Sequence, residues 1–132
     1  MPDMNPKKLL AVAAAVSTKA HAPYSRFHVG SALLTADGGI FTGCNVENAS
    51  FGLTNCAERT AVFSAVASGK KKFSAIAIVA DGTPMPYPCG ACRQVLAEFC
   101  APNMPVFVAS RGKLKAFEKT TLGELLPKAF RL

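Results

Sequence analysis

The sequence contains no apolar run near the roughly 20 residues that a transmembrane helix requires, no internal repeat and no linker-like segment. These absences argue against a membrane-spanning protein, a repeat protein and a multidomain chain. Half of the residues are apolar and the glycine and proline contents are moderate, which is typical of a globular protein. A chain of 132 residues can bury about two thirds of the surface that its unfolded form exposes. We therefore expect one domain over residues 1–132 and no membrane partner.

Acidic residues are scarce: eight Asp and Glu stand against 15 Lys and Arg, which gives a formal net charge of +7. Such a balance raises the question of a nucleic-acid partner. However, the basic run at residues 70–72 follows a predicted helix end, where the helix dipole favours cations, and most other basic residues are scattered near the C-terminus. A solvated surface explains this distribution better than a nucleic-acid groove, so we expect no nucleic-acid partner.

An even set of cysteines is also lacking, because the chain has five. A domain of this size needs no disulfide scaffold, and Cys89 and Cys92 have the spacing of metal ligands. Free thiolates fit a reducing compartment better than paired disulfides do. We therefore expect a cytoplasmic protein.

The N-terminal segment imitates a secretory signal, with Lys7 and Lys8 before an apolar stretch and small residues near position 21. The same segment also has the pattern of an amphipathic helix, with Asn5 as N-cap and Pro6 in the first turn. We favour the helix as part of the core. Its predicted apolar face consists of Leu9, Val12, Ala13, Val16 and Ala20.

The remaining chain alternates strands and helices, which predicts an α/β fold with a mixed five-stranded sheet and helices on both faces. Asp37-Gly38-Gly39 is turn chemistry and predicts an N-terminal hairpin. The last strand can return only antiparallel, because residues 110–113 leave room for nothing but a tight reversal. The predicted elements after the first helix are strands at 29–34 and 40–44, a helix at 56–67 with Asn55 as N-cap, a strand at 74–80, a helix starting at Pro88, strands at 106–109 and 114–117, and a short helix capped by Thr121.

Three cysteines at two predicted helix starts indicate a metal site. Cys56, Cys89 and Cys92 would supply three thiolates, and zinc is the metal that suits them. Structural zinc sites normally have four protein ligands, whereas catalytic sites have three and keep one position open. The other candidates for a fourth ligand have no recognisable spacing to these three, so a catalytic site is favoured. These candidates are Cys44, Cys100, His21 and His28.

Glu58 and Arg59 follow the first of these cysteines. Glu58 is either a helix cap, since it lies three residues after Asn55, or a catalytic acid that points past the helix end beside Cys56. We favour the catalytic acid, because a cap alone would need no thiols around it. Arg59 is either an exposed helix residue or a donor to a thiolate. Three thiolates on a divalent ion leave one net negative charge, which Arg59 and two helix N-termini would balance.

Four segments together make the sequence similar to the zinc-dependent cytidine deaminases of the small homotetrameric branch. They are Cys-Ala-Glu-Arg-Thr-Ala at residues 56–61, Pro-Cys-Gly-Ala-Cys-Arg-Gln-Val at 88–95, Tyr-Ser-Arg-Phe-His-Val-Gly at 24–30, and Asn-Val-Glu-Asn-Ala at 45–49. The resemblance covers nearly the whole chain. It implies a three-layer cytidine-deaminase-like fold, one zinc ion per chain and a homotetramer with shared active sites.

The resemblance also implies the reaction, which is hydrolysis of cytidine and 2'-deoxycytidine to uridine and 2'-deoxyuridine with release of ammonia, in pyrimidine salvage. Zinc-bound hydroxide would attack C4 and Glu58 would shuttle the protons, a mechanism known generally for zinc deaminases. By the same resemblance the substrate would be bound by Phe27, Asn45, Glu47, Ala57 and, from a neighbouring subunit, Phe130. Phe51 stands where many family members have Tyr, so a hydroxyl contact to the ribose is missing there.

Three alternatives stay open at this point. One is a deaminase of another aminopyrimidine, such as the nucleoside antibiotic blasticidin S, although Asn45 with Glu47 favours a plain ribose. Another is a deaminase of single-stranded DNA or tRNA, against which the predicted antiparallel last strand speaks. The third is a structural zinc module, which would need a fourth ligand.

Overall fold

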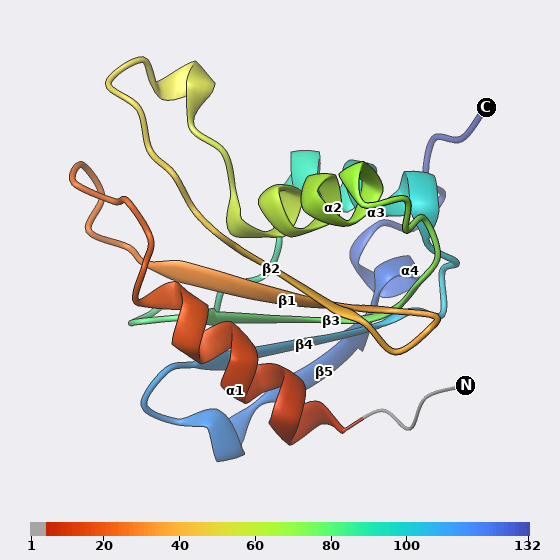
Figure 1. Cartoon of the computed structure of the whole chain (residues 1–132), viewed down its shortest axis with the longest axis horizontal. Coiled ribbons are helices and arrows are strands. Elements are labelled where there is room, and N and C mark those ends of the chain that lie inside the picture. The colour runs from red at the N-terminus through yellow and green to blue at the C-terminus, as the bar shows by residue number, and fades with distance from the viewer. Residues whose placement is uncertain (1–4) are drawn as a thin grey trace.

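The structure is a computed structural model that describes residues 5–132; the first four residues of the predicted domain lie outside the described residues. One five-stranded sheet has the order β2-β1-β3-β4-β5 (Figure 1). The strands are β1 (Val29–Thr35), β2 (Ile40–Cys44), β3 (Phe73–Ala80), β4 (Pro105–Ser110) and β5 (Glu118–Thr121). The helices are α1 (Pro6–Ser17), α2 (Ala57–Ala67), α3 (Gly90–Phe99) and α4 (Leu122–Leu125), with short 3-10 turns at Phe51–Leu53 and Leu114–Ala116.

The sheet is covered on both faces, which produces the predicted three layers. Helix α1 packs on one face, and α2, α3 and α4 lie on the other (Figure 1). Alternate residues of β3 face the two layers: Ile76 and Ile78 pack toward α2 and α3, while Ala77 and Val79 pack toward α1. Both faces of β3 are therefore buried, which explains its continuous apolar sequence. In the described part of the chain, no helix is long and apolar enough to cross a membrane.

The strand directions bring several loops to one edge of the sheet, namely the edge formed by strand ends and not the side formed by an outermost strand. Strand β1 is antiparallel to both β2 and β3, β3 is parallel to β4, and β5 is antiparallel to β4. The carboxyl ends of β2, β3 and β4 therefore lie at the same edge as the amino end of β1. Helices α2 and α3 follow β2 and β3 in the chain and begin near this edge (Figure 1).

The last strand is antiparallel as predicted, but its predicted position at residues 114–117 is wrong. Residues 114–116 form a 3-10 turn, and the strand begins at Glu118. Leu114 and Phe117 are half buried against the α1 side of the core, so their apolar character comes from a packed loop. Strand β5 lies at the edge of the sheet and is polar, and it therefore lacks the apolar pattern by which strands are recognised.

Several helix boundaries also differ from the prediction. Asn5 caps α1 as predicted, with its Oδ1 accepting from the N–H groups of Lys7 and Lys8, but α1 ends at Ser17 and not at residue 20. Asn55 is not the cap of α2; the N-cap is Cys56, and the Asn55 amide donates to Thr60 Oγ1 at 3.0 Å. The residues that α1 buries are Leu9, Leu10, Ala13 and Ser17, so only part of the predicted face was correct.

The start of the third helix also lies later than predicted. Pro88 is not its first residue, because Cys89 is the N-cap of α3 and the helix begins at Gly90. At the end of the chain Thr121 caps α4 as predicted, accepting from the N–H of Glu124 at 3.2 Å. The cysteines at positions 56 and 89 therefore occupy equivalent cap positions on two helices.

Gly43 of β2 allows α2 to lie unusually close to the sheet. A Cβ atom at this position would lie 2.3 Å from the carbonyl oxygen of Ala57 and 2.6 Å from the nitrogen of Ala61. Both of these atoms belong to the backbone of α2 and cannot rotate away. The glycine therefore sets the distance between β2 and the first turn of α2.

We expect Gly43→Ala to force α2 away from β2 and to lower the free energy of unfolding by about 1–3 kcal/mol, as overpacking of a core does. Urea denaturation followed by circular dichroism would measure this loss. Gly52→Ala is a matched control, because a Cβ atom at Gly52 would meet no atom within 4 Å. Equal stability of the two variants would contradict the packing argument.

Candidate functional site

Three cysteine sulfurs converge where α2 and α3 begin. Cys56 and Cys89 are the N-cap residues of the two helices, and Cys92 lies in the first turn of α3. Their sulfur atoms all lie within 4.8 Å of one another, with 3.9 Å between Cys56 and Cys89 and 3.6 Å between Cys89 and Cys92. Among residues 5–132 no fourth Cys, His, Asp or Glu belongs to this cluster. The structure thus brings together the three cysteines predicted as metal ligands.

The surroundings of the cluster favour a negatively charged sulfur at Cys56, whereas the hydrogen bond to Cys56 and burial raise the pKa of Cys92, so Cys56 is the first of these two thiols to ionise. Arg59 donates from Nη2 to the sulfur of Cys56 at 3.2 Å, as predicted from its position one helical turn later. A hydrogen bond from the Cys92 thiol, followed by the hydrogen bond from Arg59, lowers the pKa of Cys56 to about 5 although burial opposes this. Two helix N-termini, each equivalent to about +0.5 charge, also face the cluster.

This donor set fits zinc. Thiolates are the soft ligands that zinc prefers, and three of them occupy three of the four positions of a tetrahedral ion. With no fourth protein ligand in the described cluster, one position remains for water or substrate, as in catalytic zinc sites. Cys44, Cys100, His21 and His28 do not join the cluster, so the structure leaves them out of the ligand set.

Glu58 lies in the first turn of α2 with only 5% of its surface exposed. Burial raises its pKa to about 7, and the nearby charge of Cys56 adds to this effect. As a cap, Glu58 would accept from the N–H of Asn55, but that N–H donates to the carbonyl of Val46 at 3.0 Å. The capping interpretation is therefore not supported, and the carboxyl group is free to face the cavity beside the thiols.

A cavity of about 250 Å³ opens beside Glu58 and two of the thiols. The predicted residues on its wall are Phe27, Asn45, Glu47, Cys56, Ala57, Glu58 and Cys89. Cys92 and Arg59 do not line the cavity, and Cys92 is fully buried. The residues on the wall that sequence reasoning missed are Ser25, Val29, Thr54, Asn55, Pro86 and Tyr87. Ser25 belongs to the segment at residues 24–30 that the sequence had singled out, whereas Pro86 and Tyr87 come from a loop without any such signal.

Phe130 is not part of this cavity within one chain. It follows α4, its side chain is 69% exposed, and it does not line the cavity. The carbonyl of Phe130 accepts from the side-chain amide of Gln94 on α3 at 3.0 Å, so its backbone is held while its ring faces solvent. Its predicted place in the site of a neighbouring subunit stays a prediction.

Asn45 and Glu47 reach the cavity because their segment is held between two others. The N–H of His21 donates to the carbonyl of Asn45 at 3.0 Å, and the N–H of Glu47 donates to the carbonyl of His21 at 2.8 Å. On the other side Val46 and Asn55 exchange two backbone hydrogen bonds of 3.0 Å each. These contacts place both side chains on the cavity wall.

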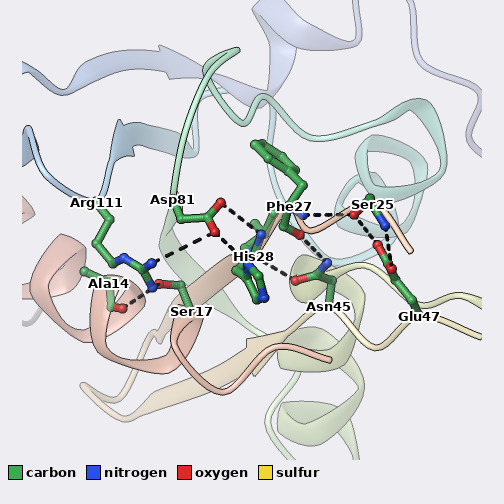
Figure 2. A network of polar contacts seen from close by, with 10 residues as sticks. Ala14, Ser17, Ser25, Phe27, His28, Asn45, Glu47, Asp81 and Arg111 are labelled. Carbon is green, nitrogen blue, oxygen red and sulfur yellow. Dashed lines mark hydrogen bonds and ion pairs between the residues drawn. The ribbon is translucent and has the colours of Figure 1, made fainter. Parts of the chain in front are cut away.

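The polar side chains of this wall also hold the segment that carries Phe27 (Figure 2). Asn45 accepts from the N–H of Val29 at 2.8 Å and donates to the carbonyl of Phe27 at 2.8 Å. Glu47 accepts from the N–H groups of Tyr24 and Ser25 at 3.0 and 3.1 Å and from the Ser25 hydroxyl. The hydrogen bond from that hydroxyl is the main cause that lowers the pKa of Glu47. Glu47 is therefore an ionised acceptor at the cavity.

A second polar network lies on the far side of Phe27 (Figure 2). Asp81, directly after β3, accepts from the N–H of His28 at 3.0 Å and contacts the His28 ring Nδ1 at 2.6 Å. Arg111, directly after β4, lies 4.0 Å from the same carboxylate and donates to Ser17 of α1 at 3.1 Å. Sequence reasoning missed Asp81, whose only signal is its position at the carboxyl end of a buried strand. The segment with Phe27 is thus fixed from both sides.

Comparisons with known proteins agree with this geometry. The family model of the cytidine and deoxycytidylate deaminase zinc-binding region matches residues 4–108. The cytidine deaminase of Sporosarcina psychrophila is 50% identical over 128 residues, which are 96% of this chain and 92% of that protein. The crystal structure of cytidine deaminase from Burkholderia pseudomallei, also 50% identical, superposes with a TM-score of 0.89 and covers 96% of this chain and 100% of that one. This superposition confirms the predicted fold.

A more distant similarity concerns a different substrate. The blasticidin-S deaminase of Bacillus cereus is 35% identical over 115 residues, which are 78% of this chain and 76% of that protein. The alternative that the chain deaminates blasticidin S is therefore represented among the proteins similar to this chain.

The Asp81 carboxylate should stabilise the fold in a pH-dependent manner. Burial alone would raise its pKa, but the hydrogen bonds from the backbone and ring of His28 outweigh burial, so the pKa in the folded protein is lower than in the unfolded chain. The contribution to stability is therefore fully present above the unfolded pKa of about 3.9 and is lost as the pH falls through the lower folded pKa.

We expect Asp81→Asn to lower the free energy of unfolding by about 1–2 kcal/mol at pH 7, and by less at pH 3, which lies below the unfolded pKa of about 3.9, so that part of the contribution of the charge is lost. Urea denaturation at the two pH values would measure both differences. Glu98→Gln, which removes an exposed carboxylate from α3, serves as the control. A difference that stayed constant with pH would show that the charge of Asp81 is not responsible.

Proposed function

The chain belongs to the cytidine and deoxycytidylate deaminase family, and from this membership we propose that it hydrolyses cytidine and 2'-deoxycytidine to uridine and 2'-deoxyuridine. One water is consumed and one ammonia is released for each nucleoside. This reaction belongs to pyrimidine salvage. The observation that carries the proposal is that a buried carboxyl group, Glu58, shares one cavity wall with Cys56 and Cys89 and with the polar pair Asn45 and Glu47.

Cys56, Cys89 and Cys92 would hold one zinc ion per chain. When bound, zinc supplies a Lewis acid that lowers the pKa of a coordinated water. Arg59, which donates to Cys56 at 3.2 Å, reduces the negative charge of the three thiolates and so keeps the site close to neutral. We assign Arg59 this charge-balancing role.

Glu58 is proposed as the group that moves protons. Its carboxyl group is buried and lies on the cavity wall, where it can take a proton from the attacking water and deliver it to N3 of the pyrimidine. It can then take the remaining proton from the hydroxyl group formed on C4 and deliver it to the departing amino group, which leaves as ammonia. A carboxyl group suits this role because it can both accept and donate a proton. Among residues 5–132, Glu47 is the only other acidic residue that lines this cavity, and it is engaged with residues 24 and 25.

Asn45 and Glu47 are proposed to bind the hydroxyl groups of the sugar. After its two hydrogen bonds to residues 27 and 29, the Asn45 amide still has one N–H for a ligand. Glu47 is ionised and accepts readily from hydroxyl groups. Phe27 would pack against the base, and Ala57, which is fully buried at the start of α2, would form the floor of the base pocket.

A homotetramer with shared sites is proposed from the exposed apolar residues near the cavity and at the chain end. Tyr24, Phe51, Leu53 and Phe130 are 52%, 74%, 71% and 69% exposed, respectively. Monomeric proteins rarely expose such groups of large apolar side chains, so a neighbouring subunit would cover them. In that assembly Phe130 would enter the pocket of the neighbour.

The cell compartment and domain organisation are part of the same proposal. All five cysteines are free thiols, which supports a reducing compartment such as the cytoplasm. We propose that residues 1–132 act as one catalytic domain and that no nucleic acid is bound. In support, Lys70 of the basic run pairs with Asp37 at 2.6 Å on the surface, away from the cavity.

We expect the purified protein to contain about one zinc per chain and to deaminate cytidine and deoxycytidine, but not an oligonucleotide, because the mechanism requires one open metal site and a pocket for a single nucleoside. Metal analysis combined with ultraviolet-monitored assays of cytidine, deoxycytidine, cytosine, blasticidin S and an oligonucleotide would test this. Full zinc loading without any nucleoside turnover would overturn the proposal. Turnover of blasticidin S alone would favour the antibiotic deaminase.

Glu58→Gln should retain zinc and lose about 10²- to 10⁴-fold in kcat, since general acid–base catalysis contributes this much. The amide has the size of the carboxyl group, but it cannot accept and return a proton. The control is Glu98→Gln, an exposed change on α3, which should leave kcat unaltered. Turnover near the wild-type rate in zinc-loaded Glu58→Gln would rule out the proton-transfer role.

A further inference from the structure

Arg93 connects the metal-binding loop to the C-terminal helix. It lies on α3, and its guanidinium group donates from Nε to the carbonyl of Pro88 at 2.6 Å and from Nη1 to the carbonyl of Leu125 at 2.8 Å. Pro88 directly precedes Cys89, and Leu125 is the last residue of α4. A single side chain therefore bridges the residue before a proposed zinc ligand and the end of a helix that lies 32 residues after Arg93 in the chain.

The end of the loop that leads to Cys89 makes few other hydrogen bonds, although Pro86 and Pro88 are buried. Between β3 and α3, residues 81–89 contain no helix or strand. Near its end the N–H of Tyr87 donates to the carbonyl of Met85 at 2.9 Å, and the Tyr87 hydroxyl donates to Glu118 of β5. Both long-range contacts at the end of the loop, those of Tyr87 and Arg93, thus reach the C-terminal part of the chain.

We propose that Arg93 is a positioning residue for the metal site and that it holds Cys89 in its ligand position by fixing the Pro88 carbonyl on α4. The carbonyl of Pro88 and the nitrogen of Cys89 belong to one planar peptide unit. Fixing the carbonyl therefore fixes the orientation of the whole peptide plane, and with it the positions of the nitrogen and Cα of Cys89. The inference rests on the proposed zinc chemistry and assigns a role to a residue that touches neither the cavity nor the sulfur cluster.

Arginine has properties that this position requires. The last carbonyls of a helix have no partner within the helix, and Arg93 supplies a donor to that of Leu125. The guanidinium group presents donors in a rigid planar fork, so two carbonyls from different segments are held at a set separation. A lysine has one flexible ammonium group and would hold this separation poorly.

We expect Arg93→Ala to release zinc about tenfold faster than the wild type. Removing a hydrogen-bond partner of a metal ligand typically lowers metal affinity or activity 10- to 100-fold, and the expected effect lies at the lower end of that range. The rate would be measured on the zinc-loaded protein with an excess of a chromogenic chelator. The cobalt-substituted variant should also show altered visible bands, since these depend on the arrangement of the thiolates. Arg93→Lys should release zinc at a rate between those of the wild type and Arg93→Ala. If Arg93→Ala does not fold, faster zinc release from Arg93→Lys than from the wild type is the result that tests the proposal.

Arg131→Ala is the matched control. Like Arg93, Arg131 donates to two backbone carbonyls, those of Ala97 in α3 and of its C-cap Cys100 at 2.5 and 3.4 Å, but at the end of α3 away from the proposed metal site. Zinc release from Arg131→Ala should stay at the wild-type rate. Equal acceleration in both variants, or wild-type release and cobalt bands in Arg93→Ala, would overturn the inference while leaving the proposed function intact. A wild-type protein that binds no zinc would overturn both.

Discussion

The sulfur atoms of the three proposed metal ligands lie within 4.8 Å of one another, and keeping three thiolates so close is the constraint that organises the site. Like charges so close repel strongly unless positive groups surround them. The fold supplies such positive groups from outside the cavity, so no lysine or arginine side chain has to lie on its wall. Two helices point their N-termini at the sulfurs, and Arg59, which does not line the cavity, donates to Cys56. Ala57 and Glu58 thereby acquire their places beside the metal site.

The sheet topology makes this convergence possible. Because α2 follows β2 and α3 follows β3, and because these two strands run in the same direction, both helices begin at one edge of the sheet. The amino end of β1 lies at the same edge and brings Phe27. Gly43 allows α2 to approach its strand closely. The site is therefore a property of strand order and helix packing as much as of the cysteines.

The features predicted correctly from the sequence are those that depend on local pattern. Buried strands, the hairpin turn and the spacing of Cys89 and Cys92 are each encoded within a few residues. The resemblance indicated Asn45 and Glu47, which lie on the cavity wall, and their role in binding substrate stays a prediction. The position of β5 could not be predicted in this way, since an edge strand that bonds through its backbone needs no apolar side chains. Asp81 was missed because its closeness to His28 depends on which loops meet at the sheet edge. The role of Asn55 was misjudged because α2 begins one residue later than predicted: Cys56 takes the N-cap position, and the Asn55 side chain donates to Thr60.

The hydrogen bonds of Asn45 have a consequence for how substrate preference can change in evolution. This side chain already links the backbone at Phe27 and Val29, so replacing it to suit another sugar would also loosen the wall that supports the base. The side chains of Tyr24 and Phe51 are not hydrogen-bonded into the wall in this way. Their rings pack against each other on an exposed rim, with 5.9 Å between the ring centroids. With the proposed sugar-binding role of Asn45, we therefore expect substitutions that change sugar preference to be tolerated more readily at the rim than on the inner wall, where they would also cost stability.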